Sequence, residues 1–140
     1  MAVFSEKEYE YLRKEELGRL ATVSKKNNPQ VTPVAFGVDK SHIYLNIKHT
    51  SQKAKNIKRN PNVSFLVDDA SPWGEEDVII RGVLISGRAE LISSDELYEK
   101  GRDLIEEKYP GYEELWGVRE DGWSKYLLVI TPNKTQSWGL

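Results

Sequence analysis

The chain has 140 residues, no cysteine and a formal net charge of −2. This length predicts a single domain over residues 1–140, and the lack of cysteine excludes disulfide bonds and thiolate metal sites. The small net charge argues against a general nucleic-acid binder, and no apolar run approaches the about 20 residues of a membrane-spanning helix.

The N-terminal segment is acidic and short of apolar residues, unlike a signal peptide, so we expect a cytoplasmic protein. Ser5 and Glu8 have the spacing of a capping box, which predicts a helix from Ser5 to about Glu16. Two runs rich in β-formers follow, over residues 18–24 and 31–39, with a polar turn between them. They predict the two strands of a hairpin.

Apolar and polar residues alternate over residues 41–48, which predicts a third strand. Its apolar side chains are expected in the core, and Tyr44, Asn46 and Lys48 are expected on the opposite face. A strand over residues 62–69 comes after a short basic helix.

The C-terminal half contains a long apolar run over residues 78–92, in which Gly82 and Gly87 predict bulges or tight bends. A second capping box at Ser93 predicts a helix to about residue 108, and a last strand is predicted over residues 125–132. This order predicts a mainly β fold, a small closed or nearly closed antiparallel barrel with peripheral helices. An open antiparallel sheet with helices on one face is the alternative.

The basic helix has an unusual first turn. The stretch HTSQKAKNIKRNP, residues 49–61, begins with the N-cap candidates Thr50 and Ser51 and ends at Pro61. Its first turn contains Lys53 and no acidic residue, although the positive end of the helix dipole favours anions. A cation at this position indicates that an anion binds there.

A phosphate site is the first interpretation of this turn. The amides of residues 51–53 would act with the Ser51 hydroxyl and the Lys53 ammonium, and Lys48 lies just upstream. The alternative is an exposed basic helix that only keeps the protein soluble. The absence of Asp and Glu between residues 40 and 67 favours binding.

Pro33 lacks an amide hydrogen, so VTPVAF, residues 31–36, is expected on an edge strand or at a bulge. The gap that Pro33 leaves in the ladder would free backbone groups for a flat polar ring. The alternative, favoured by the local sequence alone, is an edge strand that the proline protects against aggregation. Trp138, near the C-terminus, is expected to pack on the barrel or on a second subunit, and Arg81 is expected to pair with a carboxylate or a carbonyl.

Catalytic and metal-binding motifs are not found in the sequence. His42 and His49 have no partner at ligand spacing, so no metal site is expected, and there is no nucleophile elbow, P-loop or dinucleotide fingerprint. We therefore assign no catalytic side chain. If the protein does redox chemistry, a bound cofactor must supply the reactive atoms.

The chain resembles the flavin/deazaflavin oxidoreductases, a family of the split-barrel superfamily similar to pyridoxamine 5′-phosphate oxidase. Five segments carry the resemblance: LATV (20–23), VTPVAF (31–36), SQKAKNIKRNPNVSFLV (51–67), the RGV–GRAEL pair (81–91) and TQSW (135–138). It implies a homodimer of six-stranded antiparallel split β-barrels of Greek-key type, with the cofactor bound between the subunits.

The resemblance also implies roles for individual residues. The cofactor phosphate would be held by the segment after the third strand, with Asn46 and Lys48 upstream of Ser51, Gln52 and Lys53. The isoalloxazine or deazaflavin ring would lie on the second strand, at Val31, Thr32, Pro33 and Val34. Trp73 and Trp138 are candidates for the pocket wall or the dimer seam.

KHTSQK and the C-terminal Ser-Trp resemble the members that use coenzyme F-420, whereas other branches bind FMN. We therefore expect a dimeric reductase that transfers hydride from reduced coenzyme F-420 to an electron-poor double bond of a small molecule. The alternatives are an NAD(P)H-dependent FMN reductase and a non-catalytic flavin- or haem-binding protein.

Overall fold

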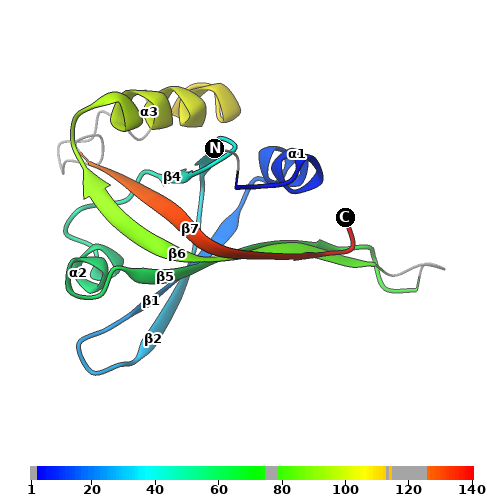
Figure 1. Cartoon of the computed structure of the whole chain (residues 1–140), viewed down its shortest axis with the longest axis horizontal. Coiled ribbons are helices and arrows are strands. Elements are labelled where there is room, and N and C mark those ends of the chain that lie inside the picture. The colour runs from blue at the N-terminus through cyan, green and yellow to red at the C-terminus, as the bar shows by residue number, and fades with distance from the viewer. Residues whose placement is uncertain (1–2, 75–78, 113, 115–125) are drawn as a thin grey trace.

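The structure is a computed structural model that describes residues 3–74, 79–112, 114 and 126–140. In these residues one curled antiparallel sheet is surrounded by three helices (Figure 1). The elements are α1 (Glu6–Lys14), β1 (Gly18–Val23), β2 (Pro29–Val34), β3 (Gly37–Val38), β4 (Ile43–Leu45), α2 (Gln52–Arg59), β5 (Asn62–Ala70), β6 (Ile80–Ile92), α3 (Glu96–Lys108) and β7 (Leu127–Trp138). The expected mainly β, antiparallel split-barrel class is confirmed.

The sheet has seven strands in the order β2-β1-β5-β6-β7-β4-β3, where six were expected. The segment predicted as one strand over residues 31–39 is divided between the two edges of the sheet. Its first part is β2, which pairs with β1, and its second part is β3, which pairs with β4. Phe36, between them, is fully buried and packs edge-on against Phe65 at 5.2 Å between ring centroids. The strand breaks because the chain must cross the core at this residue.

The main core fills the concave side of the sheet. The alternating side chains Val63, Phe65 and Val67 of β5 face into it, as predicted. α1 contributes Leu12 to this core, and α2 contributes Ile57. None of the described helices is both long enough and apolar enough to cross a membrane.

α3 covers the opposite face of the sheet, over β4 and β7 (Figure 1). Tyr44 and Asn46 face away from the main core, as predicted, but both are buried, Tyr44 beneath this helix. Tyr44 donates a 2.6 Å hydrogen bond from its hydroxyl to Asp39 Oδ2. The second capping box is also corrected, since Asp95 and not Ser93 is the N-cap of α3.

β6 and β7 form a long ribbon. A register shift lies between Ser86 and Gly87, as predicted, and a Cβ at Gly87 would lie 2.5 Å from the Thr131 carbonyl oxygen. At Gly82 the pairing runs on without a shift, and the glycine instead makes room for the ring of Trp138. β7 thus extends beyond the predicted residue 132, because the last residues of the chain pair with the first half of β6.

Candidate functional site

A cleft of about 750 Å³ lies where α2, β2 and the end of α3 meet. Its volume is in the range of cofactor sites. Four of the residues proposed from the sequence line it, namely Pro33, Val34, Asn46 and Lys53. The cleft therefore joins the predicted phosphate anchor to the predicted ring-binding strand.

The N-terminus of α2 has the geometry expected for an anion site. Ser51 is the N-cap, and its Oγ accepts a 3.3 Å hydrogen bond from the Ala54 amide. The hydroxyl hydrogen of Ser51 stays available for donation, because an accepted bond uses only an oxygen lone pair. The first turn contains no acidic residue, and Lys53 lines the cleft. The helix dipole and the ammonium group thus attract an anion together.

β2 is an edge strand, as Pro33 predicted. Pro29, Val31 and Pro33 alternate along it, so their backbone groups face the same side of the strand. A proline is compatible with the ladder only where its nitrogen faces away from β1. The carbonyl oxygens of these three residues are therefore directed to the free edge, where they can accept hydrogen bonds from a ring.

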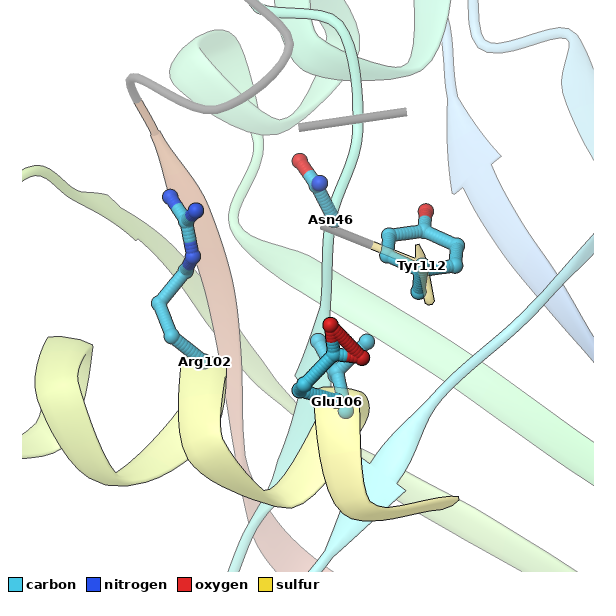
Figure 2. Close-up of a pocket in the computed structure, with 5 residues that line it drawn as sticks. Asn46, Arg102, Glu106 and Tyr112 are labelled. Atoms are coloured by element: carbon cyan, nitrogen blue, oxygen red, sulfur yellow. The ribbon is translucent and has the colours of Figure 1, made fainter. Parts of the chain in front are cut away.

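Asn46 adds a buried acceptor. The residue is 8% exposed, and its Oδ1 has no hydrogen-bond partner among the described residues. Figure 2 shows its side chain beside Arg102 and Glu106 of α3 and near Tyr112, to which it is hydrogen-bonded. An unpartnered buried carbonyl is costly, and because this oxygen is itself shielded from the cleft, we assign it no ligand contact.

Lys108 and Tyr109 bring further polar groups to the cleft. Lys108 Nζ donates a 3.0 Å hydrogen bond to the Leu12 carbonyl and lies 3.6 Å above the centroid of the Phe36 ring. Burial lowers the pKa of Lys108 to about 8, against the opposing effect of nearby Glu15 and Glu16. Near pH 8 the side chain of Lys108 therefore carries less positive charge on average than that of an exposed lysine.

Tyr109 lines the cleft and forms hydrogen bonds next to the break between β2 and β3. Its hydroxyl donates a 2.7 Å hydrogen bond to the Glu16 carbonyl and accepts a 3.2 Å bond from the Phe36 amide. Burial raises its pKa to about 12. Neither Lys108 nor Tyr109 was expected at this site from the sequence, because both approach β2 only through the packing of α3.

The other residues proposed from the sequence lie outside the lining of this cleft in the described part of the chain. Gln52 donates a 2.7 Å hydrogen bond to Asn56 and not to the cleft. Trp73 is 95% exposed, and Trp138 lies on the β6–β7 ribbon against Gly82. The remaining ones are Val31, Thr32, Lys48 and Ser51, which flank the lining residues in sequence.

The donor set fits a phosphorylated flavin-type cofactor. Lys53 and the α2 amides suit the phosphate, and the carbonyls on the free edge of β2 suit a ring N–H group. The described residues contain no group of three or more His, Asp and Glu side chains that could hold a metal ion.

Comparison with known proteins identifies the family of the chain. The model of the pyridoxamine 5′-phosphate oxidase family matches residues 4–139. The chain belongs to this family. The resemblance seen in the sequence is thereby confirmed.

The chain is also similar to three individual proteins. It is 32% identical over 124 residues to a 5a,11a-dehydrotetracycline/5a,11a-dehydrooxytetracycline reductase of Streptomyces rimosus, covering 84% of this chain and 86% of the relative. A conserved hypothetical protein of Mycobacterium tuberculosis matches with a TM-score of 0.76 at 30% identity, over 98% of this chain and 86% of that one. An F420 reductase has the same fold, with a TM-score of 0.68 at 22% identity over 95% and 98% of the two chains.

Proposed function

We propose that the protein is an oxidoreductase that binds a phosphorylated flavin-type cofactor, coenzyme F-420 in preference to FMN, and reduces an electron-poor double bond of a small molecule. The observation that carries the proposal is the shared cleft, in which Lys53 at the start of α2 and Pro33 on the free edge of β2 line one cavity. A cation and a free strand edge in one cavity provide for the phosphate and the ring of a flavin-type molecule.

The bound cofactor supplies the hydride, and the chain supplies binding, orientation and shielding. Lys53 and the first amides of α2 hold the phosphate. The β2 carbonyls would orient the ring in its plane. The aromatic and aliphatic side chains of Tyr109, Ile47 and Val34 exclude water from the cavity. Positioning of this kind accounts for catalysis without a nucleophilic side chain.

The preference for coenzyme F-420 is supported by KHTSQK and the C-terminal Ser-Trp, and an F420 reductase shares the fold. The double-bond substrate is supported by the Streptomyces relative, whose name describes reduction of a dehydro compound. A cytoplasmic location stays a prediction.

A homodimer with the cofactor at the subunit interface is part of the proposal. Apolar side chains are exposed on the long ribbon that projects from the sheet (Figure 1). Ile80 is 62% exposed and Trp138 is 38% exposed, and both lie near the same end of β6. A second copy packed there would remove this apolar surface from water.

The test is a titration of the purified protein with coenzyme F-420, FMN and haem, followed by absorption and by calorimetry. We expect saturable binding of coenzyme F-420, weaker binding of FMN and oxidation of the reduced coenzyme when an enone or quinone is added. A protein that binds only FMN and consumes NAD(P)H would be an FMN reductase instead. Tight haem binding alone would make it a haem-binding protein, and binding of none of the three would refute the proposal.

Haem ligation receives no support from the positions of the histidines. His42 Nδ1 lies 3.7 Å from Asp39 Oδ1, and the His49 ring packs against Tyr126 at 4.9 Å between centroids. Among the described residues, neither histidine lines the cleft that contains Lys53.

A further inference from the structure

Asn56 is a fully buried polar residue on the face of α2 that packs against the β1–β2 hairpin. It is 2% exposed, and its neighbours on this face, Ala54 and Ile57, are apolar and buried. Apolar side chains alone would seat the helix, so a buried amide at this position needs another explanation. Buried amides are retained where their hydrogen bonds fix one arrangement among several.

The hydrogen bonds of Asn56 join three elements. Its Nδ2 donates to Thr22 Oγ1 of β1 at 3.0 Å and to Gln30 Oε1 of β2 at 3.3 Å. Its Oδ1 accepts a 2.7 Å bond from Gln52 Nε2, one turn earlier on α2. Two hydrogen bonds donated by Nδ2 and one accepted by Oδ1 thus satisfy three of the four hydrogen bonds that the amide can make.

The position of this network relates it to the cleft. Thr22 and Gln30 are directly opposite each other in the β1–β2 pairing, so Asn56 spans the hairpin whose outer strand carries Pro33. Gln52, the third partner, lies between Ser51 and Lys53 at the start of α2. One side chain thus connects the strand that lines the ring end of the cleft to the turn that lines its phosphate end.

The Asn56 hydrogen bonds restrict the rotation of α2 about its own axis. The far end of the helix is held by Arg59, whose Nη2 donates a 3.2 Å bond to the Lys25 carbonyl at an exposed position. The hydrophobic effect that packs α2 on the sheet has no preferred direction, whereas three hydrogen bonds depend on direction and so favour one orientation of the helix. A small rotation of α2 would move Lys53 away from a phosphate whose ring is held on β2.

We propose that Asn56 is a positioning residue that fixes the separation between the phosphate anchor on α2 and the ring-binding edge of β2. This inference rests on the proposed function, because it assumes a ligand that occupies both ends of the cleft. It assigns to Asn56 no contact with the ligand. By fixing α2, Asn56 keeps Lys53 within reach of the phosphate while the ring of the ligand lies on β2.

The test compares FMN with riboflavin, which differs from it only in lacking the phosphate. Titration of the parent protein with both gives an affinity ratio that measures the phosphate contribution. In Asn56→Ala we expect this ratio to fall by about tenfold, equivalent to about 1.4 kcal/mol, while riboflavin affinity changes little. The ratio of coenzyme F-420 to its phosphate-free chromophore should fall in the same way.

A control on the same helix separates positioning from general destabilisation. Ile57→Ala removes buried apolar contacts of α2 and leaves the Asn56 network intact. It should lower the free energy of unfolding by an amount comparable to Asn56→Ala and leave the affinity ratio at the parent value. Thr22→Val should lower the ratio in the parent background and have no further effect in the Asn56→Ala background, because both changes act on one network.

The outcomes distinguish this inference from the proposed function. A parent that prefers FMN to riboflavin, with an Asn56→Ala variant that keeps the preference, overturns the positioning role alone. An equal fall of the ratio in Ile57→Ala also overturns it, since the effect would then follow from lost stability. A parent that does not distinguish the two ligands, or binds neither, overturns the phosphate anchor and the inference with it.

Discussion

Lys53 and Pro33 line the same cleft, although one begins a helix and the other lies on the outermost strand of the sheet. The contact between their elements is made by α2 packing on β1, next to β2. This arrangement places a cation at one end of a cavity and free backbone carbonyls at the other. Most of the functional predictions depend on it.

Replacement of Lys53 by alanine should weaken cofactor binding by about 1.5–3 kcal/mol, the range of a hydrogen bond to a charged group. The fold should stay intact, because Lys53 lies at the helix surface and lines the cleft. Lys55→Ala is the matched control, since Lys55 is an exposed lysine of the same helix outside the lining of the cleft. Titration with coenzyme F-420 and FMN checks the difference, and equal effects of the two variants would contradict the anchor assignment.

Replacement of Ile80 by lysine should dissociate the proposed dimer. A charge at a 62% exposed apolar position costs little in a monomer and several kcal/mol at a dry interface. Light scattering of the parent should give a dimer mass, and the variant should be monomeric with lower cofactor affinity. Val3→Lys, at a 44% exposed apolar residue far from the ribbon in sequence, serves as the control. A monomeric parent with full affinity would refute the interface.

The stability of the protein should depend on the protonation of Lys108 above neutral pH. Its pKa in the folded chain, about 8, is below the ordinary value of 10.5, so between these values the unfolded chain binds more protons than the folded one. The free energy of unfolding therefore rises with pH across this window. Relative to Lys108→Met, the parent should gain stability in urea unfolding as the pH rises above about 8. A constant difference between the two proteins would show that Lys108 titrates normally.

Asp39 should stabilise the region beneath α3 at neutral pH. Burial alone would raise the pKa of Asp39, but hydrogen bonds from Tyr44, from the Ser41 amide and from Lys100 outweigh it and lower the pKa. Because the folded pKa is lowered, the stabilisation is present above the ordinary pKa and is lost as the pH falls through the folded value. Asp39→Asn should cost about 1.5–3 kcal/mol at pH 7.

Unfolding measurements at acidic pH test this prediction. The difference in unfolding free energy between parent and Asp39→Asn should shrink as the pH falls below 3.8, the ordinary value for this carboxyl group. Tyr44→Phe removes one donor and should cost less than Asp39→Asn. An Asp39→Asn variant as stable as the parent at pH 7 would argue against the network.

Features encoded by neighbouring residues could be predicted from the sequence. The capping box of Ser5 and Glu8, the N-cap at Ser51 and the edge position of Pro33 are all present as expected. Each depends on contacts within a few residues or on the chemistry of one side chain, so the local pattern is sufficient. The family could be recognised for the same reason, since its most specific motif is a continuous run.

Only the tertiary structure decided how distant segments share the two faces of the sheet. The strand over residues 31–39 divides at Phe36, and the hydroxyl that receives the Phe36 amide belongs to Tyr109, 73 residues away. Lys108 reaches the carbonyl of Leu12 across 96 residues. These contacts arise from packing that no local periodicity records. This is why the packing of α3 over the sheet, the burial of Asn46 and the far wall of the cleft were found only in three dimensions.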